Sequence, residues 1–261
     1  MASAAVGGRI FNLSIEAEDL SLSYNIEAEV ISKFGIPATR TGDRIILSLA
    51  AVDLVSSIRT APAIDGNGLH DSAFLVIDFT SGVWLSGRGG NAGNGGRGQW
   101  DTEPPGRDIS RVGVLGSDGG IALRLGCPTE LIGTGDVEKG YGAGGGGGGG
   151  ATSANNAHGG GGGGGGAPLG NGGSGGVDVN EGNDDGADGA AATNTARGAS
   201  GAAGGVNAGN GGAGGDSGNV AQAGGNGIRN GGAAGTDGNA IDKQGFALTI
   251  GAGVTVTGDI V

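Results

Sequence analysis

Residues 143–176 read AGGGGGGGATSANNAHGGGGGGGGAPLGNGGSGG. Two runs in this stretch, Gly144–Gly150 and Gly159–Gly166, contain only glycine, and residues 170–176 keep a glycine at every third position. A period of three is typical of polyproline II geometry, whereas an α-helix or a strand would show 3.6 or 2. The stretch therefore predicts extended helices with three residues per turn.

The same period continues on both sides of this stretch and predicts a bundle. A lone helix of this kind leaves its backbone N–H and C=O groups unpaired, and neighbouring helices can pair them only where no Cβ holds the backbones apart. One glycine face suits an edge helix, and an all-glycine run suits a helix surrounded by neighbours. We expect about ten such segments, near 87–98, 113–122, 140–150, 159–166, 170–176, 186–192, 198–204, 209–218, 221–227 and 231–240.

Composition excludes several classes of protein. The 261 residues include 68 glycines but only six prolines, which argues against a collagen fold. A net charge of −12 argues against nucleic acid as a partner, and the absence of any run of about 20 apolar residues argues against insertion in a membrane. The single cysteine, Cys127, is expected to be a buried thiol. A flexible glycine linker is the alternative to the bundle, but a disordered linker would not keep glycine at every third position.

We expect a mainly irregular and β fold in three parts. Residues 1–86 form a β-rich attachment domain, with a short helix over about 24–34 that ends near Gly35 and with Trp84 in its core. Residues 87–245 form the polyglycine II bundle. Residues 246–261 form C-terminal strands that return to the base.

An even number of segments returns the chain to the base. Loops after the odd-numbered segments then lie at the far end, at 99–112, 151–158, 177–185, 205–208 and 228–230. The connection at 123–139 lies at the base, and its apolar, strand-like sequence fits packing against the first domain.

At this point the chain resembles a known family. The stretch GVWLSGRGGNAGNGGRG at 82–98, the glycine run at 143–150 and GGAAG at 231–235 are similar to glycine-rich phage tail-fibre adhesins of the T-even type. The likeness covers roughly residues 42–261. It implies stacked polyglycine II helices whose loops bind outer-membrane proteins or surface glycans. Residues 1–41 lack the tryptophan-rich attachment region of that family, so the mounting on a fibre is left open.

The far loops supply the candidate receptor-binding residues. Exposed tryptophan beside fixed polar groups suits a sugar face or an apolar protein loop, although Trp100 could instead pack on the bundle flank. Amides and imidazole can bind hydroxyls or simply form turns. The acidic third loop could meet a basic receptor, hold a cation through its carboxylates, or be a solvated charge run. The candidates are Trp100, Asp101, Glu103, Arg107, Asp108, Asn155, Asn156, His158, Asp178, Asn180, Glu181, Asp184 and Asp185.

The sequence as a whole predicts a binding protein and no enzyme, with no metal and no cofactor. It contains no phosphate-binding GxxxxGK[ST] motif, and no Ser/His/Asp grouping falls in a predicted pocket. We predict a phage tail-fibre tip adhesin in the virion, with a bacterial surface receptor and a tail-fibre or tail-tip protein as partners. The alternatives are a structural tail or spike component and an ice-binding polyglycine II protein.

Overall fold

The computed structural model describes residues 8–16, 23–50, 53–56, 58–180 and 184–261. Over these residues the fold is β-rich and irregular, with one helix. The chain divides into two compact units. The solenoid unit holds Met1–Gly87, Ile121–Lys139 and Asn239–Val261, and the glycine unit holds Arg88–Gly120 and Gly140–Gly238. The predicted boundaries kept 121–139 and 239–245 in the same part as the glycine segments.

The solenoid unit is built on two parallel sheets. The larger has the order β1-β3-β6-β10-β14, with β4 beside β6 and β15 beside β10. Its strands are β1 (Ile10–Ile15), β3 (Arg44–Leu49), β4 (Asp53–Val55), β6 (Phe74–Ser86), β10 (Thr129–Glu138), β14 (Leu248–Ile250) and β15 (Val254–Thr257). The smaller has the order β13-β9-β5-β2, made of β2 (Tyr24–Asn25), β5 (Ile64–Asp65), β9 (Leu123–Arg124) and β13 (Ile241–Asp242).

Strands of the two sheets alternate along the chain, so the unit winds in successive parallel coils like a β-solenoid. The glycine unit is inserted twice between coils, at 88–120 and at 140–238. Every second residue of the large sheet points into the core, where Leu47, Ile77 and Leu131 are fully buried. Cys127 is also buried there, and burial raises the pKa of its thiol to about 12.

The predicted helix is confirmed as α1 (Ile26–Phe34). It begins at Asn25, whose side chain accepts a hydrogen bond from the N–H of Ala28, and ends at Gly35 in the left-handed conformation. Trp84 is not in the core as predicted. It is half-buried, and its indole N–H donates to Glu138 2.8 Å away, because the neighbouring Val83 and Leu85 take the inward positions of β6.

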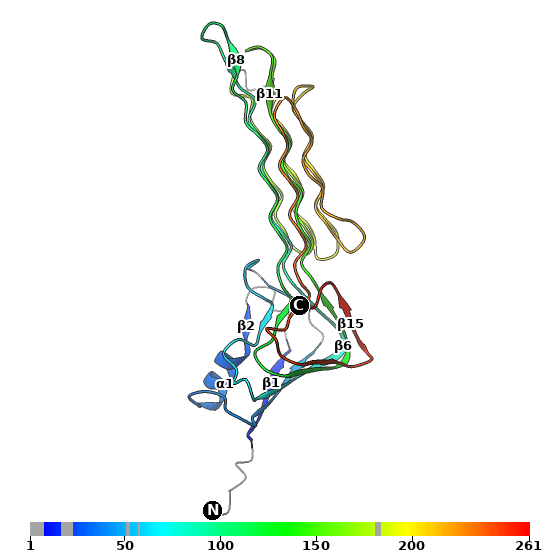
Figure 1. Cartoon of the computed structure of the whole chain (residues 1–261). Helices are drawn as coiled ribbons and strands as arrows, with labels where there is room; N and C mark the ends of the chain where they lie inside the picture. The colour runs from blue at the N-terminus through cyan, green and yellow to red at the C-terminus, as the bar shows by residue number, and fades with distance from the viewer. Residues whose placement is uncertain (1–7, 17–22, 51–52, 57, 181–183) are drawn as a thin grey trace, which may run out of the picture. The chain divides into compact units, whose positions relative to one another are not determined.

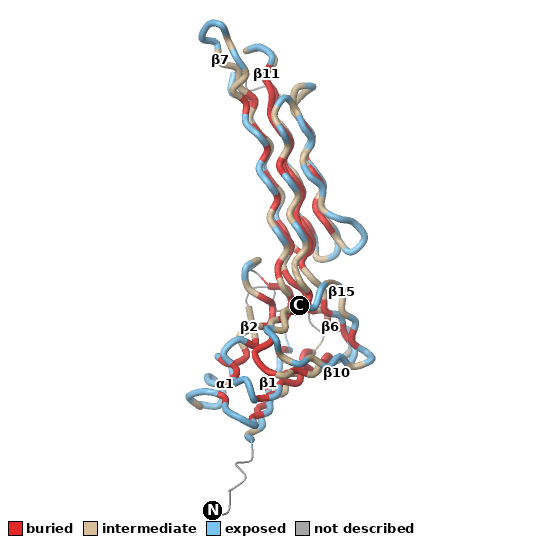
Figure 2. The backbone as a smooth tube through the Cα atoms, viewed as in Figure 1, coloured by how far each residue is buried: buried red, intermediate tan, exposed pale blue. Residues whose placement is uncertain are grey.

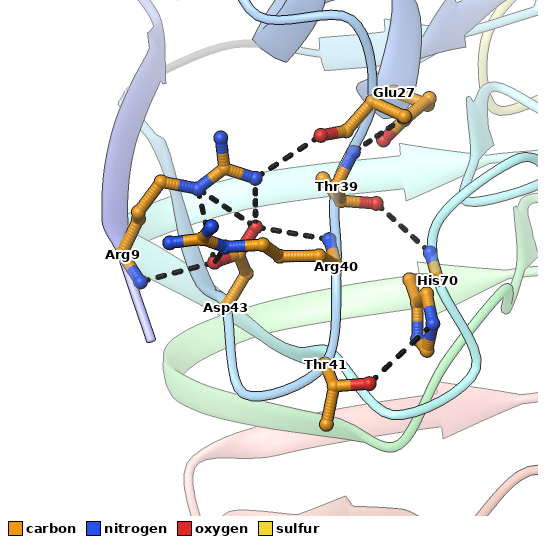
Figure 3. A network of polar contacts seen from close by, with 8 residues as sticks. Arg9, Glu27, Thr39, Arg40, Thr41, Asp43 and His70 are labelled. Atoms are coloured by element: carbon orange, nitrogen blue, oxygen red, sulfur yellow. Dashed lines mark hydrogen bonds and ion pairs between the residues drawn. The ribbon is translucent and has the colours of Figure 1, made fainter. Parts of the chain in front are cut away.

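A buried carboxylate holds the start of β1 (Figure 3). Asp43 is fully buried and accepts hydrogen bonds from the backbone N–H groups of Arg9 and Arg40, and from the Arg9 guanidinium at 2.5 Å. Beside it, Glu27 accepts from the N–H of Thr39. Burial alone would raise the pKa of Asp43, but the hydrogen bonds and charge of Arg9 outweigh it and hold that pKa below its usual range.

The Asp43→Asn variant tests this contact. A depressed folded pKa contributes stability that is present above the unfolded pKa of about 3.9 and lost as the pH falls through the folded value. We expect Asp43→Asn to lower the free energy of unfolding at pH 7 by roughly 1–3 kcal/mol. In denaturant titrations the gap to the wild type should close as the pH falls below about 4. Asp71→Asn, on the surface, is the control. A gap that stayed constant with pH would contradict the assignment.

The glycine unit consists of extended segments that run side by side without forming helices or strands over most of their length (Figure 1). They lie at 88–98, 111–120, 140–149, 159–166, 170–176, 186–192, 198–204, 209–215, 220–226 and 230–238. Both all-glycine runs are buried throughout, whereas the outer segments alternate buried and exposed residues (Figure 2). The runs are therefore surrounded by neighbours, as their lack of side chains predicts.

The lateral hydrogen bonds follow the period of three. In the first run, the N–H groups of Gly144 and Gly147 donate to the segment 159–166, at 2.9 and 2.8 Å. The N–H groups of Gly145 and Gly148 donate to 220–226. The N–H groups of the remaining set, Gly146 and Gly149, donate to 111–120. Carbonyls of the same run accept from three further segments: 88–98, 209–215 and 230–238. One segment is thus tied to neighbours all around it.

These contacts leave no room for a Cβ. A Cβ on Gly146 would lie 2.0 Å from the carbonyl oxygen of Asn94, and one on Gly162 would lie 2.0 Å from that of Gly173. Both distances are far inside van der Waals contact, and the obstructing atom is backbone in each case. Glycine is required at these positions for close approach.

Where a segment has an outer edge, Asn and Asp side chains take over as acceptors. Asn94 accepts from the N–H of Ser174 at 3.0 Å, and Asp188 accepts from that of Gly175 at 2.8 Å. Asn91, Asp118, Asn210 and Asn226 make the same kind of contact with a neighbouring segment. The polar residues between the glycines thus complete the lateral pairing at the surface of the unit.

Two matched alanine variants test the close approach. Gly146→Ala should destabilise the glycine unit by roughly 3 kcal/mol or more, because its Cβ must push two backbones apart. Gly218→Ala should be nearly neutral, since the nearest atom to its Cβ is a side-chain oxygen 3.8 Å away. Thermal unfolding measures both. Equal stability of the two variants would show that the packing is looser than described.

Candidate functional site

The two ends of the glycine unit differ: the chain enters and leaves at one end, and the predicted far loops lie at the other. Its chain enters and leaves at Arg88, Gly120, Gly140 and Gly238, which backbone hydrogen bonds of 2.7–3.0 Å link at one end. The connections that the sequence places at the far loops gather at the opposite end (Figure 1). We call that end the tip, and it comprises the described residues of 99–110, 150–158, 177–185, 204–208 and 226–230.

The first loop is a hairpin of β7 (Trp100–Asp101) and β8 (Arg107–Asp108). Arg107 and Asp101 form an exposed ion pair at 3.3 Å across it. The half-buried indole of Trp100 lies over Gly106, where a Cβ would come within 3.1 Å of the indole nitrogen. Gly106 has a φ of 67°, a conformation that favours glycine. Trp100 therefore packs on its own hairpin.

An amide side chain ties this hairpin to the third loop. Asn180 accepts from the N–H of Trp100 at 2.7 Å and donates to the carbonyl of Trp100 at 3.1 Å. In the same loop Asp185 accepts from the N–H of Asp178, and Asp178 accepts from that of Asn180. Three of the predicted binding residues thus hold the loop in place with their side chains.

A charged pair ties the hairpin to the last loop. The guanidinium of Arg229 lies 2.9 Å from a carboxylate oxygen of Asp108 and donates to the Asp108 carbonyl at 2.7 Å. Asp108 is largely buried, so this pair is shielded from solvent more than a surface ion pair would be. Arg229 escaped the sequence analysis because nothing in its neighbourhood marks a partner so distant along the chain.

The second loop is the hairpin of β11 (Gly150–Ala151) and β12 (Ala157–His158). Asn156 donates to the hydroxyl of Thr152 at 2.7 Å, and Asn207 of the fourth loop donates to the Asn156 carbonyl. His158 is buried, and its ring contacts the carboxylate of Asp184 and the backbone N–H of Asn207. Asn155 is exposed at the end of this hairpin.

The structure brings the predicted residues together at the tip but gives them different surroundings. Glu103, Arg107, Asn155, Asn180 and Asp185 are exposed, Trp100, Asp101, Asp108, Asn156 and Asp184 are half-buried, and Asp178 and His158 are buried. Glu181 lies outside the described residues. No group of three or more His, Cys, Asp or Glu side chains in the described part of the chain is arranged to hold a metal ion.

The sequence analysis missed the exposed aliphatic side chains of the tip. Val206 is 92% exposed, and Val177, Val179 and Ile228 are also exposed. A branched apolar residue in a short polar loop is a signal that could have identified them, since such residues in surface loops have no core to fill. Together with the acidic side chains they give the tip a mixed apolar and negative surface.

A model of the phage tail fibre adhesin Gp38 family matches residues 11–261. The chain belongs to this family. It is therefore a phage tail-fibre protein of the virion with a role in attachment to the host. Comparison with curated proteins finds no match. A family of adhesins agrees with the binding role expected from the sequence.

One solved structure is similar in fold to this adhesin. It is the crystal structure of the gp37-gp38 adhesin tip complex of the bacteriophage S16 long tail fiber, with 21% identity and a TM-score of 0.53. The similarity covers 97% of this adhesin and 82% of the matched chain. No helix in the described residues of this adhesin is long and apolar enough to cross a membrane.

Replacement of Asn180 tests the link between the first and third loops. In a Trp84→Phe background, Trp100 is the only tryptophan that emits. Asn180→Ala removes both hydrogen bonds to the Trp100 backbone, which should free the hairpin and raise acrylamide quenching of Trp100 fluorescence. Asn155→Ala, on the neighbouring hairpin, is the control. Quenching that did not respond to Asn180→Ala would show that the hairpin is held in other ways.

Proposed function

We propose that this protein recognises a receptor on the bacterial surface, an outer-membrane protein or a glycan, with the tip of a polyglycine II bundle. The observation that carries the proposal is the gathering of loops from separate parts of the chain at the tip. Family membership supports the adhesin role. The receptor class is what the resemblance to glycine-rich tail-fibre adhesins implies, and the residues that touch the receptor are inferred from the tip.

The hydrogen-bond pattern supports polyglycine II as the geometry of the glycine segments. Successive N–H groups of the first run point to three different neighbours and return to the same neighbour after three residues. This repeat matches a helix with three residues per turn and no internal hydrogen bonds. A strand would instead alternate between two directions.

The surface of the tip suits recognition by contact and charge. Preorganised loops lose little conformational entropy on binding, and here polar contacts hold each loop to its neighbours. The exposed Val206 and Ile228 can bury apolar surface against a receptor, while Asp101, Glu103 and Asp184 favour partners with positive or hydrogen-bond-donating groups.

The solenoid unit is the proposed attachment part. The similar structure is a complex of gp37 with gp38, which supports a tail-fibre protein as the partner of this chain. Within the predicted parts, we assign attachment to 1–86 with the strands of 246–261, and receptor display to the glycine segments of 87–245.

Two exposed valines at opposite ends of the glycine unit provide a matched test. Val206 lies at the tip and is 92% exposed, whereas Val220 lies at the other end and is 77% exposed. We expect Val206→Asp to weaken binding of fluorescently labelled protein to host cells by about tenfold or more, since a charge replaces apolar contact. Val220→Asp should bind like the wild type. Neither change should alter the melting temperature, because both side chains are exposed.

The outcomes separate the proposed site from its alternatives. Equal loss with both variants would place the contact along the flank of the glycine unit. Equal binding by both and by the wild type would move the site away from Val206. Absence of wild-type binding to every strain tested, including the natural host, would favour a structural role in the tail.

A further inference from the structure

His158 occupies a position in the tip that a receptor contact does not explain. It is only 6% exposed, so its side chain has little surface to offer to a receptor. It ends β12, and its backbone is packed against Gly98, where a Cβ would come within 2.3–2.5 Å of His158 backbone atoms. The backbone of His158 is therefore held in place by the neighbouring segment at Gly98.

Both ring nitrogens of His158 contact other loops. Nδ1 accepts a hydrogen bond from the N–H of Asn207 at 3.4 Å, and Nε2 lies 3.2 Å from a carboxylate oxygen of Asp184. Since Nδ1 accepts, Nε2 carries the ring proton and faces the Asp184 carboxylate. One side chain thus links the second loop to the third and the fourth.

The ring also packs tightly on the fourth loop. A Cβ on Gly205 would lie 2.4 Å from Cδ2 and 2.5 Å from Nε2 of the imidazole. The absence of a Cβ on Gly205 therefore lets the ring lie directly on the backbone of the fourth loop. The backbone around it is held as well, since Gly159 donates to the Asp184 carbonyl and Gly204 donates to that of Gly159.

We infer that His158 is a positioning residue that sets the relative placement of the second, third and fourth loops for receptor binding. The inference rests on the proposed function of the tip. It differs from that function in assigning His158 no receptor contact. Its effect on binding comes from the placement of Asp184 and of the turn 205–208, where Val206 is exposed.

The contacts of the ring with Asn207 and with Asp184 can be removed separately. His158→Leu removes both. In His158→Asn the side-chain oxygen sits near the place of Nδ1, so it can still accept from Asn207. In His158→Gln the amide nitrogen reaches farther and can still donate to Asp184. Gly205→Ala keeps the histidine but pushes its ring off the fourth loop. Val220→Asp remains the control at the other end.

Three measurements apply to each variant: amide hydrogen exchange of the free protein, the dissociation rate from host cells, and the melting temperature. His158→Leu and Gly205→Ala should speed exchange at 184–187 and at 205–208, and should raise the dissociation rate by about tenfold. His158→Gln should restore protection at 184–187 only, and His158→Asn at 205–208 only. Exchange in the run 144–150 should stay unchanged throughout.

We call it a split rescue when His158→Gln restores protection in one loop only and His158→Asn in the other only. A histidine with a merely structural role would not give this result. Uniform exchange changes in all variants, or none in His158→Leu, would overturn the inference. If His158→Leu did not fold, the comparison of His158→Gln with His158→Asn would decide alone. Exchange is measured without cells, so a split rescue with no host binding by the wild type would reject the proposed function and leave the positioning role standing.

Discussion

The close approach of backbones without Cβ atoms is the constraint on which the glycine unit depends. Ordering a glycine costs roughly 0.5–1 kcal/mol more than ordering an alanine, and a net hydrogen bond returns about 0.5–1.5 kcal/mol. The two quantities balance only if nearly every backbone group finds a lateral partner. In the run 144–150 the N–H groups do so on three sides. One added methyl group would break several of these bonds together, because the obstructing atoms are carbonyls of neighbouring segments.

This constraint explains the separation of roles along the chain. Along the two all-glycine runs, neighbouring backbones leave no room for a side chain. Side chains return at the outer edges, where Asn and Asp complete the pairing, and at the ends, where loops connect the segments. The tip uses polar side chains such as Asn180 and Arg229 to hold loops together and leaves residues such as Val206 exposed. The result is a closely hydrogen-bonded support with its side chains gathered at the edges and ends.

Sequence alone could predict the features that depend on local pattern. The period of three gave the extended segments, the two buried runs and the loops that gather at the tip, and Asn25 with Gly35 marked the ends of the helix. The parallel coils of the solenoid unit could not be predicted, because β1 pairs with β3 across a helix, and β6 with β10 across an inserted stretch of glycine. No local signal encodes such pairings.

At the candidate site, the sequence could not predict which neighbour each side chain contacts. The sequence singled out polar and aromatic residues of the tip but not its exposed aliphatic ones. Whether each residue binds a receptor or a neighbouring loop depends on contacts far apart in sequence. His158 and Asp184 are 26 positions apart (184 − 158) yet lie 3.2 Å from each other. Asp108 and Arg229 are farther apart still along the chain and lie at 2.9 Å.

Amide hydrogen exchange with and without outer-membrane vesicles from a sensitive host tests the central claim most directly. The account predicts that the runs 144–150 and 159–166 are protected in the free protein at the level of global unfolding. It also predicts that vesicles add protection at the described segments of the tip and not in the solenoid unit. Rapid exchange in the two runs would contradict the lateral hydrogen bonding. New protection confined to the solenoid unit would contradict the tip as the receptor-binding site.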